Sequence, residues 1–147
     1  MTETQYTAKK WLNRTYIEAQ EIGALQEKLE QMESEINRAV KPLGASEIQT
    51  DHDHTAQEIK LAAYSDLKVE VLNRLQELWR QEARSLEIIG KLEKSNHRTI
   101  LILRYVNRMT WAKIINEMHI AEPTAFRFHI EALDAIAPLI PKEEANE

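Results

Sequence analysis

The residues with the clearest capacity for chemistry lie between positions 91 and 130. This block holds seven Lys or Arg against three Glu, a net charge of +4, whereas the segments before and after it carry −5 and −4. Cations gathered in one segment can neutralise the phosphates of a nucleic acid, even though the whole chain carries −5. The block is therefore the first candidate for a functional surface.

A helix that enters the major groove of DNA reads base edges with the side chains of its first turns. Near the end of the block, Arg127 can bind guanine in a bidentate manner, Phe126 can contact a thymine methyl group, and Thr124 can contact thymine or phosphate. Cations upstream suit phosphate contacts, and two Glu on the helix face repel phosphate but can accept a hydrogen bond from cytosine. The candidate DNA-binding residues are Arg104, Arg108, Thr110, Lys113, Glu122, Thr124, Phe126, Arg127 and Glu131.

Some of these side chains also have a plainer interpretation. Arg104, Arg108 and Lys113 are equally compatible with a solvated charged helix face, because helices commonly expose charges. Trp111 suits either the apolar core of a small domain or a phosphate contact through its indole N–H. The net charge of the block favours phosphate contact for the cations.

The elements that position these residues have the spacing of a helix-turn-helix. Short helices are expected at 95–106, 111–118 and 122–136. A three-residue turn at 119–121 separates the last two, Thr110 suits the N-cap of the middle helix, and Pro123 suits the first turn of the last one. The inward residues are expected to be Ile100, Leu101, Leu103, Ile114, Met118, Ile120, Ala125, Phe128, Ala132, Leu133 and Ile136. Residues 95–137 are thus a predicted DNA-binding domain, and 138–147 a frayed tail.

The stretch RTILILRYVNRMTWAKIINEMHIAEPTAFRFHIEAL resembles the promoter-reading C-terminal domain of sigma factors. It resembles still more closely the sigma-like domain of the ArpU- and RinA-type late-gene activators of phages of Gram-positive bacteria. The matching residues are Ile100, Leu101, Leu103, Arg104, Tyr105, Thr110, Trp111, Ile114, Met118, Thr124, Arg127, Ala132 and Leu133. The resemblance implies sequence-specific binding of double-stranded DNA and transcriptional control of phage genes.

Three positions depart from the pattern of that family. His119 stands where the turn usually has glycine, and a non-glycine residue in a left-handed conformation costs about 1 kcal/mol. Ala121 stands where serine usually caps the recognition helix, which removes about 1 kcal/mol of stabilisation. Ile115 occupies a position that is usually small. These departures bear on how tight the turn is.

Residues 1–92 are expected to form a helical oligomerisation region. Two long helices at about 7–40 and 56–92 are joined by a linker at 41–54, which contains the helix-stopping Pro42 and Gly44. The first carries a heptad seam at Ile22, Leu25, Leu29, Met32 and Ile36. The second carries a broader stripe at Leu72, Leu75, Trp79, Leu86 and Ile89, widened by Val71, Leu78, Ile88 and Leu92. Such helices pair within one chain or between chains, and a homo-oligomer, with a dimer favoured, is expected.

Composition excludes several other classes. Only 3 Gly and 4 Pro among 147 residues favour an all-α fold over a loop-rich or all-β one. The absence of Cys excludes a disulfide framework, a thiolate zinc site and a cysteine nucleophile. No glycine-rich phosphate loop or serine elbow occurs, so we expect neither an enzyme nor a cofactor. No membrane span or signal peptide is expected, and the predicted location is the cytoplasm of a bacterial host.

One further cluster, Asp51-His52-Asp53-His54, has the residue types of a metal site. Neighbouring residues on one segment seldom complete a coordination shell, so a solvated linker is favoured over a metal site, and no metal is expected.

Three functions remain open from the sequence. The first is a DNA-binding regulator whose N-terminal helices dimerise and contact RNA polymerase. The second is a phage DNA-packaging component resembling a small terminase subunit, which is disfavoured because the helix-turn-helix there commonly comes first. The third is a protein-binding regulator with a degenerate helix-turn-helix, which stays open because of the acidic charge, Ala121 at the cap position, and the outward-facing Phe126 and Ile130.

Overall fold

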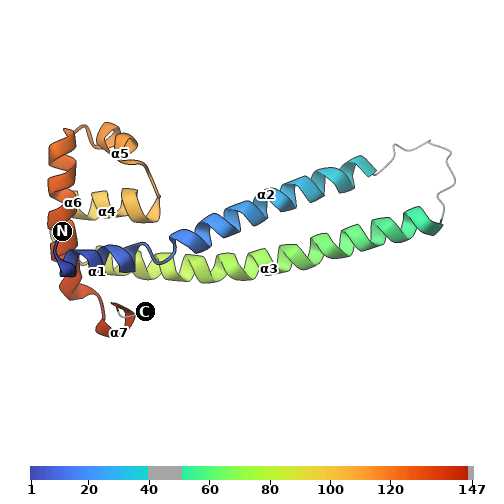
Figure 1. Ribbon diagram of the computed structural model, residues 1–147, viewed down its shortest axis with the longest axis horizontal. Coiled ribbons are helices and arrows are strands. Elements are labelled where there is room, and N and C mark those ends of the chain that lie inside the picture. Colours follow the sequence, from blue (N-terminus) through green and yellow to red (C-terminus); the bar gives the residue numbers. More distant parts are fainter. Residues whose placement is uncertain (40–50, 146–147) are drawn as a thin grey trace. The chain divides into compact units, whose positions relative to one another are not determined.

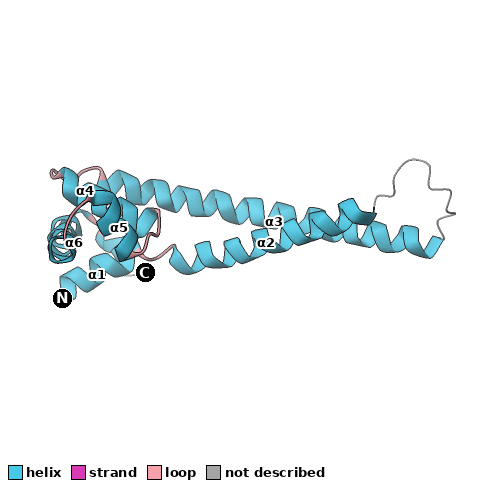
Figure 2. Cartoon of the chain, turned by 90° about the horizontal axis from the view of Figure 1, so that it is seen from above, coloured by secondary structure: helices cyan, strands magenta, loops and turns pink. Residues whose placement is uncertain are grey.

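The computed structural model describes residues 1–39 and 51–145, which are largely helical and contain no β-strand (Figures 1 and 2). The α-helices are α1 (Glu3–Leu12), α2 (Tyr16–Ala39), α3 (Asp51–Ile89), α4 (Ser95–Leu101), α5 (Trp111–Met118), α6 (Glu122–Ile136) and α7 (Lys142–Ala145). A π-helical turn, η1 (Ile102–Val106), follows α4, and a 3₁₀ turn, η2 (Ala137–Leu139), follows α6. The all-α prediction is confirmed. Within the described residues, none of the helices has both the length and the hydrophobicity that a membrane span requires.

The chain divides into two compact units. Met1–Ile17 and Trp79–Glu147 form one, the head unit, and Glu18–Leu78 form the other, the hairpin unit. The expected division, with an N-terminal region of 1–92 and a separate domain at 95–137, is therefore redrawn. The reason is that α1 and the end of α3 supply part of the same apolar core as α4 and α6.

The expected helix at 7–40 is in fact two helices. Thr2 begins α1 with a capping box, in which Gln5 N–H donates to Thr2 Oγ1 and the Thr2 N–H donates to Gln5 Oε1. The helix stops at Asn13, and Arg14 then donates to the carbonyl oxygen of Trp11 at 2.9 Å and to Ser85 Oγ at 3.0 Å. Because the helix is broken between α1 and α2, the apolar face of α1 need not follow the seam of α2. It packs in the core of the head unit instead.

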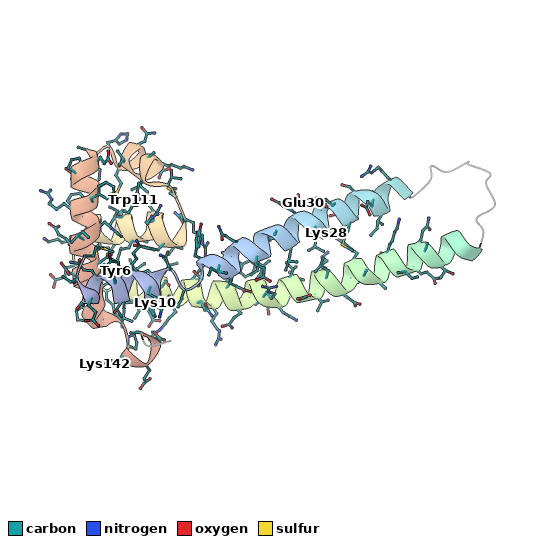
Figure 3. The ribbon with its side chains drawn as sticks, in the orientation of Figure 1. Tyr6, Lys10, Lys28, Glu30, Trp111 and Lys142 are labelled. Carbon is teal, nitrogen blue, oxygen red and sulfur yellow. The ribbon has the colours of Figure 1, made fainter. Side chains whose placement is uncertain are left out.

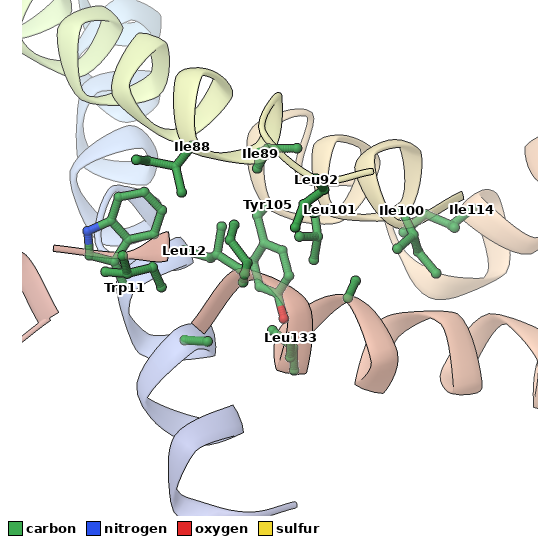
Figure 4. Close-up of a cluster of buried hydrophobic side chains, with 14 of the residues drawn as sticks. Trp11, Leu12, Ile88, Ile89, Leu92, Ile100, Leu101, Tyr105, Ile114 and Leu133 are labelled. Atoms are coloured by element: carbon green, nitrogen blue, oxygen red, sulfur yellow. The ribbon is translucent and has the colours of Figure 1, made fainter. Parts of the chain in front are cut away.

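The core of the head unit gathers apolar side chains from five helices, α1, α3, α4, α5 and α6, and from the turns between them (Figure 4). Its fully buried members include Leu12 of α1, Ile88 of α3, Ile100 of α4 and Leu133 of α6. Helix α6 packs chiefly on α4 and on α1. This core fixes which face of α6 points inward and leaves the opposite face free.

The hairpin unit is an α2–α3 pair within one chain. Ile22, Val71 and Leu78 are buried between the helices. Partly buried residues pack around them, namely Ala19, Leu25, Leu29, Leu67 and Leu75. Arg74 bridges the two helices, since its guanidinium donates to Glu18 at 2.8 Å and contacts Glu21 at 3.1 Å. The N-terminal half of the predicted α2 seam therefore packs within the chain.

The predicted stripe of the second helix separates into two faces. Val71, Leu75 and Leu78 point into the hairpin unit, whereas Leu72, Trp79 and Leu86 are 47%, 55% and 42% exposed. The prediction that all of them share one packed face is wrong, because residues one apart are rotated by about 100° around a helix.

The predicted start of the second long helix also changes. The helix expected at 56 begins at Asp51, so Asp51–His54 belong to α3 and Thr55 lies inside the helix rather than at its cap. The side chains of Asp51–His54 lie outside the described residues, as do residues 41–50 of the predicted linker.

The expected frayed tail at 138–147 contains structure as far as it is described. Ile140 is buried in the head unit, and the residues after it form α7. The carboxylate of Glu144 accepts a hydrogen bond from Arg84 of α3 at 3.2 Å. The burial of Ile140 and this ion pair hold a segment that the sequence predicted to be frayed.

Candidate nucleic-acid interface

The helix-turn-helix consists of α5, a turn at 119–121 and α6. Thr110 caps α5, because its Oγ1 accepts a hydrogen bond from the Lys113 N–H at 3.3 Å. His119 ends α5 in the left-handed conformation, with φ 54° and ψ 45°. Ala121 then occupies the N-cap of α6 in an extended conformation without a side-chain cap. The predicted helices and the predicted turn are confirmed. His119 lies in the left-handed position of the turn and Ala121 at the uncapped N-cap, as expected from the two departures at these positions.

The inward face of α6 is buried and carries a polar contact at its centre. His129 Nε2 lies 2.6 Å from the hydroxyl oxygen of Tyr105 in η1, and the two rings stack. Burial, with smaller contributions from Lys9 and Arg104, lowers the pKa of His129 to about 4. Burial also raises the pKa of Tyr105 well above its usual value. Both side chains are therefore neutral at pH 7, and one hydrogen bond joins them.

Two more hydrogen bonds fix α6 at its flanks. His97 of α4, itself buried, donates from Nε2 to Glu131 Oε2 at 3.1 Å. Gln5 of α1 donates from Nε2 to Asp134 Oδ1 at 2.8 Å. Together with the Tyr105 contact, these bonds restrain the rotation of α6 about its axis. The side chains on its outward face are held in a defined register.

An aromatic cluster joins α5 to α6. The ring of Trp111, at the start of α5 (Figure 3), lies 5.2 Å from the ring of Phe126 and 4.8 Å from that of His129. The guanidinium of Arg104 lies 5.0 Å from the centre of the Trp111 ring. Since Trp111 is partly buried against the head-unit core, the interpretation of this residue as a core anchor is the one that these contacts favour.

The predicted DNA-binding residues fall into two groups, those exposed on the outward face and those with partners inside the protein. Those of the outward face are free to meet a ligand: Lys113, Glu122, Phe126 and Arg127 are exposed, and Thr124 is half-buried beside them. Arg127 is 64% exposed in its side chain and lies 3.9 Å from Glu131, a loose i,i+4 contact. Thr110, the N-cap of α5, is also exposed, although its hydroxyl serves as a helix cap. Glu131 is half-buried and accepts the hydrogen bond from His97.

Three arginines of the basic block have partners inside the protein. Arg98 donates to the carbonyl oxygens of Leu92 at 2.6 Å and Glu93 at 3.0 Å. Arg104 donates to the carbonyl oxygen of Met109 at 2.9 Å. Part of the positive charge that suggested phosphate binding therefore satisfies backbone carbonyls in the head unit.

The third of these arginines, Arg108, lies in the connector before α5. Its backbone has a φ of 56°, in the left-handed region. Its Nη2 donates to Glu82 Oε1 at 2.8 Å and to Thr15 Oγ1 at 3.3 Å, while Nη1 donates to the Val106 carbonyl oxygen at 3.2 Å. Arg108 thus ties the connector to α3 and to the α1–α2 break, all within the head unit.

A family model described as "Protein of unknown function (DUF1492)" matches residues 60–137, just over half of the chain. The chain belongs to the DUF1492 family. No curated protein and no solved structure matches the chain. The DUF1492 match begins inside α3 and ends at the first residue of η2, so it includes both helices of the helix-turn-helix.

Sequence reasoning missed the polar residues that hold the DUF1492 helix-turn-helix together. His97, His129, Gln5 and Asp134 belong to no motif in the sequence. One signal for His129 was present: it follows Ala125 by four residues and precedes Ala132 and Leu133 by three and four, which places it on the inward face of α6. Among the residues that the structure describes, no cluster of His, Asp and Glu could hold a metal ion.

Proposed function

We propose that this chain is a sequence-specific DNA-binding transcriptional regulator that inserts α6 into the major groove. The observation that supports this best is the division of α6 into two faces. The inner face is buried, and three side-chain hydrogen bonds hold the helix, one at the centre of this face and two at its flanks, while Phe126 and Arg127 remain exposed near the N-terminus of the helix. A rigid helix with free side chains on its first turns is what base readout requires.

The roles of the individual side chains follow from their positions. Arg127 is the candidate for bidentate contact with guanine, and Phe126 with Thr124 for contact with thymine. Lys113, exposed in the first turn of α5, is the candidate phosphate contact. Arg104 and Arg108 mainly stabilise the conformation of the segment between η1 and α5. Glu122, exposed in the first turn of α6, disfavours phosphate there and suits cytosine.

The resemblance to ArpU- and RinA-type late-gene activators supports a role in controlling phage or prophage genes in the cytoplasm of a bacterial host. A single helix-turn-helix makes few phosphate contacts and binds DNA weakly, whereas two linked copies gain affinity through effective concentration. We therefore propose a homo-oligomer, with a dimer favoured, that recognises repeated half-sites. RNA polymerase is a further proposed partner.

Fluorescence anisotropy tests DNA binding directly. The probe is a duplex from upstream of the late operon of the protein's own genome, with a scrambled duplex alongside, at two salt concentrations. Specific binding that weakens with salt supports the proposal, and the slope reports the number of phosphate contacts. Equal, weak binding to both duplexes, and to every fragment of that genome tested, contradicts it.

A pair of variants locates the readout. Arg127→Ala should weaken specific binding by about 1–3 kcal/mol and relax the preference at one base position. The matched control is Lys28→Ala, since Lys28 is an exposed cation of α2 in the hairpin unit (Figure 3). If both variants lose the same amount of affinity, binding is a general charge effect and base readout by α6 is excluded.

A second candidate function is the binding of another protein. It is favoured by the internal hydrogen bonds of Arg98 and Arg104, which leave fewer free cations, and by exposed Phe126 next to Glu122. Phe126→Ala discriminates between the two functions. Loss of a protein partner with unchanged DNA binding supports this candidate, whereas loss of discrimination at a thymine supports the first.

A further inference from the structure

Helix α3 carries a second heptad seam, here called the outer seam, that differs from the face packed on α2. It comprises Ala62, Ser65, Val69, Leu72, Gln76, Trp79, Ala83 and Leu86. The steps along it alternate between three and four residues, which is the spacing that keeps one stripe facing a partner helix. None of its members is charged, and all are exposed. An exposed, uncharged heptad seam is a surface that normally contacts another helix.

The partner of the outer seam is not α2. The residues of α3 that pack on α2 are Leu67, Val71, Leu75 and Leu78. Trp79 follows Leu78 directly and Leu72 follows Val71 directly, so the outer seam is rotated by about 100° from that face. One helix therefore presents two stripes, an apolar one that packs on α2 and the uncharged outer seam, and the pairing with α2 uses only the first.

The segment between α2 and α3 is too short to cover the outer seam at Trp79. Residues 40–50 join Ala39 to Asp51, and eleven residues span at most about 40 Å when fully extended. Trp79 lies 28 residues beyond Asp51, or about 42 Å along the helix. A segment that is joined to α2 at one end and to α3 at the other cannot reach Trp79 and return to the start of α3.

We propose that the outer seam of α3 docks on the outer seam of a second copy of this chain, forming an antiparallel two-stranded coiled coil. The inference names the surface for the self-association proposed above. It does not depend on DNA binding, so the two proposals can fail separately.

The order of large and small side chains favours the antiparallel arrangement. In the antiparallel register centred between residues 77 and 78, Leu72 meets Ala83 of the other copy, Trp79 meets Gln76, and Leu86 meets Val69. Each layer then combines a larger with a smaller side chain, and the two-fold axis repeats each layer once. A parallel arrangement stacks Trp79 on Trp79 and Ala83 on Ala83, which overfills one layer and leaves a gap in the next.

Sedimentation equilibrium without DNA tests the interface. We expect the wild-type chain to reach the mass of two chains at about 100 µM or below. Trp79→Glu should raise the dimer dissociation constant at least about 100-fold, since it places a charge in the apolar seam of both copies. Because Trp79 is exposed within one chain, the circular dichroism spectrum of the Trp79→Glu variant should match that of the wild type.

The matched control is Ile17→Glu, which introduces the same charge at the most exposed apolar side chain of α2. It should leave the dissociation constant unchanged. A monomeric wild type at 100 µM, a ring-like assembly of many chains, or equal losses in the two variants would each overturn the proposal.

Cysteine cross-linking tests the orientation, because the natural chain has no Cys. Leu72→Cys and Ala83→Cys are prepared as separate proteins and oxidised alone and as a mixture. In the antiparallel register residue 72 lies opposite residue 83, while the two copies of residue 72 are about 16 Å apart along the helix and beyond disulfide reach. Covalent dimers in the mixture alone support the proposal, whereas dimers from each single variant indicate parallel helices and overturn it.

Discussion

The hydroxyl oxygen of Tyr105 lies 2.6 Å from Nε2 of His129, inside the unit that carries the helix-turn-helix. The contact joins η1 to the middle of α6. Because both groups are buried, each needs the other to satisfy its hydrogen-bonding capacity. The position of α6 in the head unit thus depends on a pair of neutral side chains.

The burial of His129 predicts a pH-dependent stability. Its pKa is lowered to about 4 in the folded chain, against 6.5 as the usual value, so the unfolded chain binds the extra proton first. The stabilisation is complete above about pH 6.5 and is lost as pH falls towards 4. The full loss amounts to about 3 kcal/mol. Urea unfolding at a series of pH values between 4 and 7.5 measures it.

Carboxylates also titrate in the lower part of this range, so the comparison with His129→Gln is essential. Glutamine can hydrogen-bond to Tyr105 but does not titrate. The wild type should lose more stability than the variant between pH 6.5 and 4.5. Parallel curves for the two proteins would show that His129 is not the group responsible.

The Arg108–Glu82 pair predicts a structural role for an arginine of the basic block. Both side chains are mostly covered, at 25% and 21% exposed, and the guanidinium also binds Thr15 and a backbone carbonyl. Arg108→Ala should lower the free energy of unfolding by about 1–3 kcal/mol, because Glu82 is left without its partner. Urea unfolding measures the change.

Lys113→Ala is the matched comparison for Arg108→Ala. Lys113 is exposed and contributes only its backbone N–H to the Thr110 cap, so stability should be unchanged. In the DNA-binding assay, its removal should reduce the salt slope by about 1. A salt slope that falls for Arg108→Ala at full stability would instead make Arg108 a phosphate contact.

Local signals made the helix-turn-helix predictable from the sequence. Thr110 caps α5 through its own hydroxyl, Pro123 suits the first turn of α6, and the apolar spacing selects the inward face. Each signal acts within about four residues. The structure accordingly begins and ends α5 and α6 at the predicted positions.

Contacts between distant residues were not predictable in the same way. Arg108 pairs with Glu82, 26 residues away, and Gln5 pairs with Asp134, 129 residues away. No periodicity marks such pairs, and single charged residues look alike until their partners are known. The same limit applies to α1: the sequence pattern places it in the oligomerisation region, because nothing in its apolar face indicates that it packs on α6.

The left-handed backbone of His119 predicts a gain on substitution. Glycine adopts a φ of 54° without the penalty that a Cβ imposes. His119→Gly should raise the free energy of unfolding by up to about 1 kcal/mol, since the exposed imidazole packs little. His119→Ala, which keeps a Cβ and removes the ring, is the control. An equal gain in both variants would assign the effect to the ring and not to the backbone.

The uncapped start of α6 predicts a second gain. Ala121 has the extended conformation of an N-cap, with φ −74° and ψ 153°, but no side-chain oxygen to accept from the first backbone N–H groups. Ala121→Ser should therefore stabilise the head unit by about 0.5–1 kcal/mol, measured as a shift in the urea midpoint at constant slope. Ala121→Val adds bulk without an acceptor and should give no gain. If valine stabilised the unit as much as serine, the free N–H groups of α6 would already have partners, and capping would not explain the effect.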